Sequence, residues 1–120
     1  MYLQKKTYLS FLFSLFFGIT SCNAQIKNSK TEEVKIYGNC GMCEKKIESA
    51  GNKKNISKVD WNKETKIATI TFNTNKTNVD EILMRIAASG YDSDNFRAAD
   101  EVYHNLHECC QYERPNNAKE

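Results

Sequence analysis

The order of the short strand and helix patterns constrains the fold of this chain more than any other feature. Alternating apolar and polar residues predict strands with one buried face, and apolar residues spaced three and four apart predict amphipathic helices. Asn78 is a suitable N-cap for the second helix, with Glu81 three residues later, and Gly90 is a suitable C-terminal stop. The patterns run strand, helix, strand, strand, helix and strand, over residues 34–37, 43–50, 56–61, 66–72, 78–90 and 95–98.

This order predicts an α+β fold. Two strand–helix–strand units with right-handed crossovers pack as a ferredoxin-like βαββαβ sandwich, whose four-stranded antiparallel sheet carries both helices on one face. The chain has 120 residues, of which 40% are hydrophobic, and this fits one small folded domain. The expected core is confined to residues 32–98, so its margin of stability should be small.

The first residues have the pattern of an export signal. Two lysines precede an apolar run over residues 8–19, which is shorter than the roughly 20 residues that a membrane-spanning helix needs. The ITSC segment that ends at Cys22 resembles the lipobox of bacterial lipoproteins. The resemblance implies a signal peptide over residues 1–21, a lipid anchor on Cys22 and an extracytoplasmic location in the cell envelope. The alternative is an ordinary cleaved signal, with Cys22 as a spare thiol.

Composition separates the rest of the chain into a tether, a domain and a tail. Residues 22–31 are polar without periodicity and predict a tether, residues 32–98 form the domain, and residues 99–120 form the tail. The chain has 17 Lys and Arg against 15 Asp and Glu, a balance that argues against a dedicated nucleic-acid-binding protein. No nucleophile–base pattern, acid–base carboxylate pair or phosphate loop is visible, and we expect no enzymatic activity.

The Cys40-Gly41-Met42-Cys43 segment lies where the first strand pattern ends and the first helix pattern begins. The N-terminus of a helix lowers the pKa of a nearby thiol through its unpaired N–H groups and its dipole, and the thiolate is the form that ligates metals. Soft thiolates favour Cu(I) or Zn(II) over Mg(II) or Ca(II). Two sulfurs satisfy near-linear Cu(I) or Hg(II) more easily than tetrahedral Zn(II). We therefore predict a site for a soft metal ion at Cys40 and Cys43, foremost Cu(I), with Zn(II), Cd(II) and Hg(II) as further candidates.

A CxxC motif in this order of elements resembles the heavy-metal-associated domain, the family of copper chaperones, metal-ATPase N-terminal domains and periplasmic mercury-binding proteins. In the family motif, Gly-Met-x-Cys-x-x-Cys, the ligands match Cys40 and Cys43, but Tyr37 and Gly38 stand where the family has Gly and Met. The family's packing beneath the loop is therefore not carried over. The SGYD segment resembles the loop after the second helix, which implies that Tyr91 lies beside the site. The resemblance also implies transfer of the ion to a metal-transporting ATPase or another metal-accepting protein, or its sequestration.

Four further possible ligands lie close together in the tail. Imidazole and thiolate both suit Cu and Zn, so these residues predict either a second metal site or extra ligands that complete the first. The alternative is a polar tail that Tyr103 and Leu106 anchor to the core, or that stays mobile. The four residues are His104, His107, Cys109 and Cys110.

Two other functions fit the same cysteines. A CxxC motif that opens a helix is also typical of a thioredoxin-type redox dithiol, although this chain is short for that fold and its only Pro is Pro115. The second alternative is a tethered interaction module that binds no metal. A purely structural disulfide between Cys40 and Cys43 is a separate alternative. Under oxidation, Cys109 or Cys110 is a further candidate to bridge to either of them.

Overall fold

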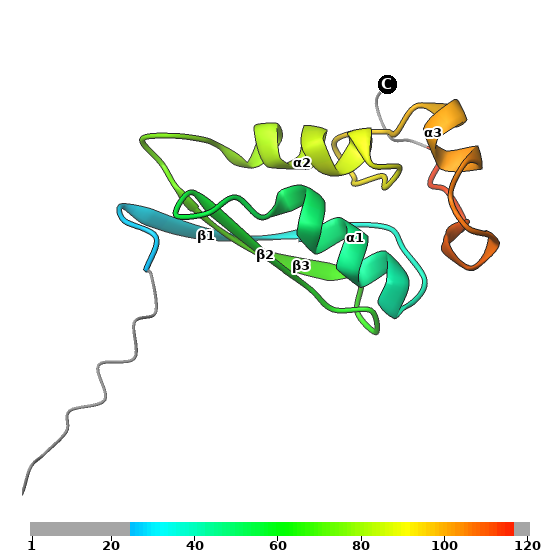
Figure 1. Cartoon of the computed structure of the whole chain (residues 1–120), viewed down its shortest axis with the longest axis horizontal. Coiled ribbons are helices and arrows are strands. Elements are labelled where there is room, and N and C mark those ends of the chain that lie inside the picture. The colour runs from blue at the N-terminus through cyan, green and yellow to red at the C-terminus, as the bar shows by residue number, and fades with distance from the viewer. Residues whose placement is uncertain (1–24, 117–120) are drawn as a thin grey trace, which may run out of the picture.

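The computed structural model describes residues 25–116, so the predicted signal peptide and Cys22 lie outside the described range. Two long helices pack on a small antiparallel sheet, and the C-terminal residues fold against one end of the domain (Figure 1). No helix within this range is long and apolar enough to cross a membrane. The elements are β1 Ser29–Lys35, α1 Gly41–Gly51, β2 Ser57–Trp61, β3 Ile67–Asn73, α2 Val79–Ala88, α3 Asp100–His104 and the 3-10 helix η1 Glu108–Cys110.

The sheet has the order β1-β3-β2, and both neighbours of β3 run antiparallel to it. Burial alternates along β3, where Ala68, Ile70 and Phe72 are buried and Thr69 is exposed. This alternation gives the sheet one apolar face, as the period of a strand requires. The structure thus confirms an α+β fold with an antiparallel sheet.

Both long helices pack against the apolar face of the sheet and against each other. Gly51 ends α1 so close to β2 that a Cβ there would lie 2.3 Å from Cγ2 of Val59. The same Cβ would lie 3.2 Å from Cδ1 of Ile86 in α2. Because no larger residue fits, Gly51 sets how closely the two helices and β2 approach one another.

The prediction of a fourth strand over residues 95–98 is wrong, because the described sheet has three strands. A single isolated bridge joins Ile36 to Ser93. Beyond it the backbone turns: Ser93 N donates to Phe96 O at 2.8 Å, and Ala98 N donates to the Asp92 carboxylate at 2.7 Å. These bonds fold the segment into a loop around Asp92 in place of a ladder with β1.

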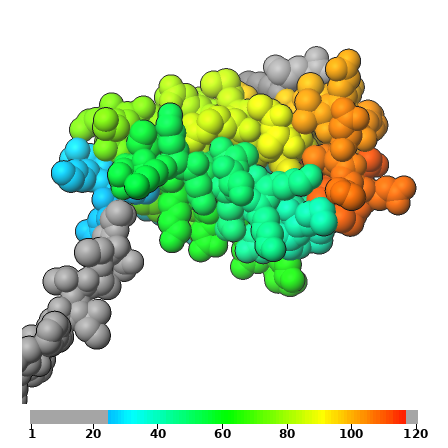
Figure 2. All heavy atoms as spheres, viewed as in Figure 1, coloured from blue at the N-terminus to red at the C-terminus, as the bar shows by residue number. Residues whose placement is uncertain are grey.

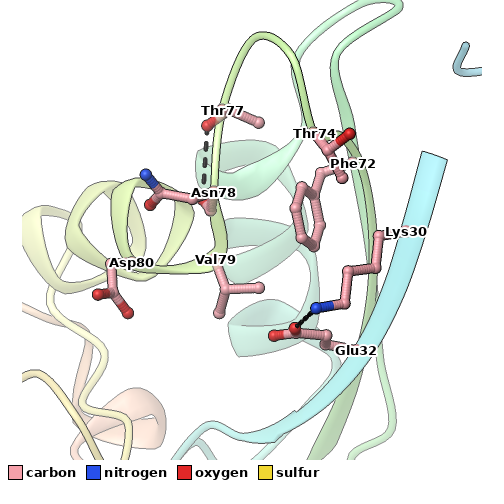
Figure 3. A pocket seen from close by; sticks show the side chains of 8 residues that line it. All are labelled: Lys30, Glu32, Phe72, Thr74, Thr77, Asn78, Val79 and Asp80. Carbon is pink, nitrogen blue, oxygen red and sulfur yellow. Dashed lines mark hydrogen bonds and ion pairs between the residues drawn. The ribbon is translucent and has the colours of Figure 1, made fainter. Parts of the chain in front are cut away.

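The edge strand β1 starts earlier than its sequence pattern does. It begins at Ser29, and Thr31 Oγ1 lies 3.1 Å from Thr71 Oγ1 of β3, so the last residues of the predicted tether join the sheet. A surface pocket lies between β1 and the start of α2, beside the Lys30–Glu32 ion pair (Figure 3). None of the described residues that line this pocket is a Cys or a His, so the thiol chemistry of the chain lies elsewhere.

Candidate metal site

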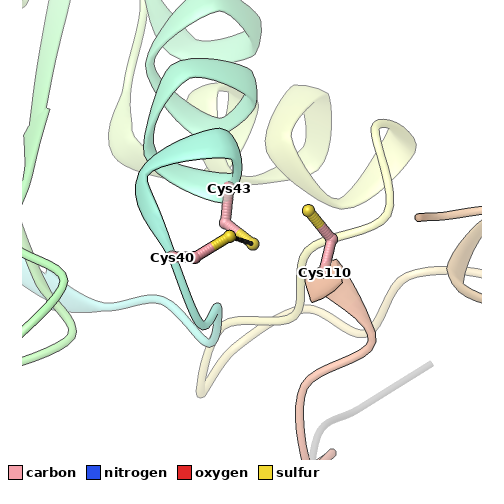
Figure 4. A group of neighbouring side chains, drawn as sticks. All are labelled: Cys40, Cys43 and Cys110. Atoms are coloured by element: carbon pink, nitrogen blue, oxygen red, sulfur yellow. Dashed lines mark hydrogen bonds between the residues drawn. The ribbon is translucent and has the colours of Figure 1, made fainter. Parts of the chain in front are cut away.

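Three cysteine sulfurs converge at the N-terminus of α1 (Figure 4). Cys40 immediately precedes α1, Cys43 lies in its first turn, and Cys110 belongs to η1 near the C-terminus. Sγ of Cys40 and Sγ of Cys43 are 3.7 Å apart, and all three sulfurs lie within 4.8 Å of one another. Cys43 and Cys110 are fully buried, Cys40 is half-buried, and all three are free thiols. The fold thus joins a motif near the start of the domain to a residue of the tail.

The start of α1 sets the ionisation of the first two thiols. Cys40 is the N-cap in an extended conformation, and its sulfur lies near the N–H groups of Cys43 and Met42 without a fully aligned capping bond. These N–H groups lower the pKa of Cys40 to about 7, whereas burial raises the pKa of Cys43. Near neutral pH, Cys40 is therefore the more readily ionised of the two thiols.

Alkylation should distinguish these two thiols by pH. We expect the rate at which iodoacetamide modifies Cys40 to rise as the pH passes about 7, below the value near 8.5 of a free thiol, because only the thiolate reacts. Cys43 should react only at higher pH and more slowly, because its pKa is raised and its side chain is buried. Mass spectrometry of the labelled peptides at a series of pH values measures both rates. An inflection for Cys40 at the pH of a free thiol would contradict the effect of the helix terminus.

The tail packs on the domain as a segment that we call the C-terminal clip, residues 100–116. Leu106, Cys110 and Tyr112 are part of the hydrophobic core. Oη of Tyr112 donates to Gly90 O and accepts from Asp92 N, both at 2.8 Å. Gly90 has a φ of +111°, and a Cβ there would lie 2.9 Å from Leu106, so glycine permits both the turn and the contact.

A buried ion pair fixes the clip to the loop after α2. The Arg114 guanidinium donates to both carboxylate oxygens of Asp92, at 2.8 and 3.0 Å, and Asp92 is fully buried. It also donates to Ala98 O at 2.6 Å and to Asp100 at 2.7 Å, and it lies 4.6 Å from the centre of the Tyr103 ring. The bond to Asp92 raises the pKa of Arg114 further above its ordinary value. The clip is therefore held on the side of the domain that adjoins the sulfurs.

Tyr91 lies between this anchor and the sulfurs. Its ring is fully buried and stacks on Tyr112 at 5.9 Å, and its hydroxyl has no hydrogen-bond partner within residues 25–116. Burial and the neighbouring thiols of Cys110 and Cys43 raise its pKa, so the hydroxyl keeps its proton. An O–H group in this position is available to donate to a thiolate. Tyr91 thus lies beside two of the three sulfurs, and its role in the site stays a prediction.

The other predicted ligands lie outside the group of three sulfurs. Cys109 is exposed, and its Sγ lies 3.9 Å from Cys110 Sγ and 4.0 Å from Met42 Sδ. His104 and His107 are exposed on the clip. The tail thus brings one of its four candidates, Cys110, into the group, and a metal-binding role of all four stays a prediction.

Trp61 packs beneath the loop that precedes α1, a role that the sequence did not indicate. Its indole Nε1 donates to Ile36 O at 2.9 Å, and its ring fills the space beside Gly38. A Cβ on Gly38 would lie 3.0 Å from the Trp61 ring and 3.3 Å from Cβ of Cys43. The signal for this contact was the glycine that stands at the position of the family's Met.

A solved structure provides the comparison of this chain with a known protein. Neither a protein-family model nor a curated protein matches the chain. The chain is similar to the solved structure of a CopZ metallochaperone, with 27% sequence identity and a TM-score of 0.50. The match covers 53% of this chain and 98% of that chain. The domain is like a heavy-metal-associated domain. The likeness and the cysteine cluster together support this statement.

Proposed function

We propose that the protein binds a soft heavy-metal ion, Cu(I), through the thiolates of Cys40 and Cys43 and either transfers it to a partner or sequesters it. The observation that carries the proposal is the pair of free thiols 3.7 Å apart at the start of α1, in a fold similar to that of a CopZ metallochaperone. We further propose that the protein acts outside the cytoplasm, tethered to a membrane by a lipid on Cys22. The lipobox-like segment supports this location.

The chemistry of the site supports a soft ion over a hard one. The group of neighbouring ligand atoms within the described range consists of sulfur alone, whereas Mg(II) and Ca(II) prefer oxygen ligands. Thiolates also bind Zn(II), Cd(II) and Hg(II), but a structural Zn(II) takes four ligands. A partner would be a metal-transporting ATPase or another protein that offers thiolates, because a soft ion moves between proteins by exchange of one sulfur ligand for another. The proposal includes no enzymatic step.

Replacement of both Cys40 and Cys43 by Ser should abolish tight Cu(I) binding, because a hydroxyl is a poor ligand for a soft ion. The measurement is a titration without oxygen against a Cu(I) chelator of known affinity. A matched control is Cys109→Ser, which removes an exposed thiol outside the group and should leave binding unchanged. Circular dichroism should be nearly unchanged in both variants. Stoichiometric binding retained by the double variant would refute the proposal.

One observation favours a second candidate function, thiol–disulfide exchange. A pKa of about 7 for Cys40, beside a second free thiol, is also what a redox dithiol needs. An assay of disulfide reduction in a protein substrate separates the two functions. Catalytic reduction that depends on both Cys40 and Cys43, without Cu(I) binding, would favour the redox function.

A further inference from the structure

We propose that Cys110 is the third thiolate ligand of the site and that the C-terminal clip must open before the ion can leave. The inference deepens the proposed function and rests on it. The clip is then a movable part of the metal site. When the clip is closed, three sulfurs hold the ion, and when it is open, the ion is exposed to an acceptor protein.

The separation of the sulfurs carries the first step. With a metal–thiolate bond of about 2.3 Å, linear coordination places two sulfurs about 4.6 Å apart and trigonal coordination about 4.0 Å. Sγ of Cys40 and Sγ of Cys43 are 3.7 Å apart, and the farthest pair of the three sulfurs is within 4.8 Å. The two sulfurs of the CxxC pair are thus closer together than linear coordination requires. Cys110 lies where a third ligand would complete a triangle with small movements of the side chains.

The surroundings of Cys110 carry the second step. Cys110 is fully buried, and its sulfur lies within 4.8 Å of the sulfurs of both Cys40 and Cys43. Three thiolates around Cu(I) carry a net negative charge, which burial disfavours unless donors face the sulfurs. The unpartnered hydroxyl of Tyr91 lies beside Cys43 and Cys110, and the N–H groups at the start of α1 lie beside Cys40. Hydrogen bonds to a charged acceptor are the strong ones, so these donors favour the thiolate form.

The clip also lies across the loop that carries the pair. The backbone carbonyl of Cys109 accepts from the Asn39 amide at 3.4 Å and from the Cys40 thiol at 3.8 Å. Figure 2 shows the atoms of the clip packed against the start of α1. The contact with Cys40 is long, whereas Tyr112 and Arg114, which follow Cys110 in the chain, hold the clip through bonds of 2.8 Å. This arrangement permits the segment around Cys110 to lift while the anchor stays in place.

Transfer through the open clip balances without a redox step. The bond between Cu(I) and Sγ of Cys110 breaks, and a bond between Cu(I) and a thiolate of the acceptor forms. Cys110 takes up a proton in exchange for the proton that the acceptor thiol loses. Copper remains Cu(I), and no electrons move between the groups. With Cys110 in place, the acceptor must compete with a ligand that the fold holds at the site.

X-ray absorption spectroscopy of the full chain loaded with Cu(I) tests the third ligand directly. All samples carry Cys22→Ser, so that this cysteine adds no thiol. We expect three sulfur neighbours around copper in this chain and two, at shorter distance, in Cys110→Ser. The variant should also bind Cu(I) at least roughly tenfold more weakly, because loss of even an outer partner costs about 10- to 100-fold in metal affinity. It should release Cu(I) to a chelator faster.

Cys109→Ser is the matched control, one residue away. Its thiol is exposed, and its contact with the loop runs through the backbone carbonyl, which the substitution keeps. We expect three sulfur neighbours and unchanged release in this variant. Two sulfur neighbours in the chain with Cys110 intact would overturn the inference without any variant, and so would equal effects of the two substitutions. Either result leaves the proposed function standing, which fails only if Cys40→Ser with Cys43→Ser retains tight binding.

Discussion

Replacement of Arg114 by Met should lower the free energy of unfolding by about 3–5 kcal/mol, because it leaves a buried carboxylate without its partner. Asp92 is fully buried, and only 11% of the Arg114 side chain is exposed, so water screens this pair little. The Ala98 N–H still bonds to the Asp92 carboxylate in the variant, but it carries no full charge. Met keeps most of the apolar volume of the Arg side chain, so the decrease in the free energy of unfolding measures mainly the loss of the ion pair. Urea unfolding followed by circular dichroism gives the free energy.

Arg97→Met is the matched control for this prediction. Arg97 lies 3.8 Å from Asp100, whose side chain is 69% exposed, and it donates to Pro115 O at 3.0 Å. Its loss leaves no buried charge without a partner, so it should cost only about 1 kcal/mol. The double variant Asp92→Asn with Arg114→Met removes the buried charge together with its partner and should recover part of the loss. Equal destabilisation by Arg97→Met and Arg114→Met would show that the buried pair does not anchor the clip.

The elements with local signals were predictable from the sequence. The side chain of Asn78 accepts from Glu81 N at 2.9 Å, as the capping pattern predicted, and α2 begins at the next residue. The α1 helix lies where its apolar pattern predicted it, although it begins at Gly41, two residues before the start of that pattern at Cys43. Cap residues and apolar periodicity act within one turn or one strand, so the sequence alone contains the information they need.

The clip and the missing fourth strand depend on contacts between distant residues. The Asp92 carboxylate accepts one hydrogen bond from Ala98 N and two from Arg114. These bonds form in place of the strand expected at residues 95–98. No local pattern links Asp92 to an arginine in the tail. The same packing brings Cys110 close to the CxxC pair. From the sequence spacing alone, the tail residues could equally form a second site or complete the first. A buried acidic residue needs a partner, but the sequence does not say which one.

The departure from the family motif at Gly38 has its explanation in the packing of Trp61. The Trp61 ring is 1% exposed and lies where a side chain at residue 38 would begin. Residues 38 and 61 therefore share one space beneath the loop. The large side chain of Trp61 in β2 fills it, and glycine at residue 38 leaves room for that side chain. The sequence shows the exchange at residue 38 but not the residue that fills the space, because the two positions lie on different elements.

Trp61→Ala should consequently lower the free energy of unfolding by about 3–5 kcal/mol, the range for removing a buried aromatic side chain. The variant leaves a cavity beside Gly38, whose own Cβ position lies 3.3 Å from Cβ of Cys43, and removes the indole bond to Ile36 O. We expect faster alkylation of Cys43 as well, because the cavity lets the start of α1 move. Urea unfolding and the labelling rates measure the two effects.

Gly38→Met provides the decisive comparison for Trp61→Ala. Alone, it should destabilise the domain by about 1–3 kcal/mol through overpacking, because its Cβ would lie 3.0 Å from the Trp61 ring. Combined with Trp61→Ala, it refills the cavity from the loop side, so the double variant should be more stable than Trp61→Ala alone. Losses that simply add would mean that the two side chains do not share one volume. Recovery of both stability and the slow labelling of Cys43 would show that either residue can support the loop that precedes α1.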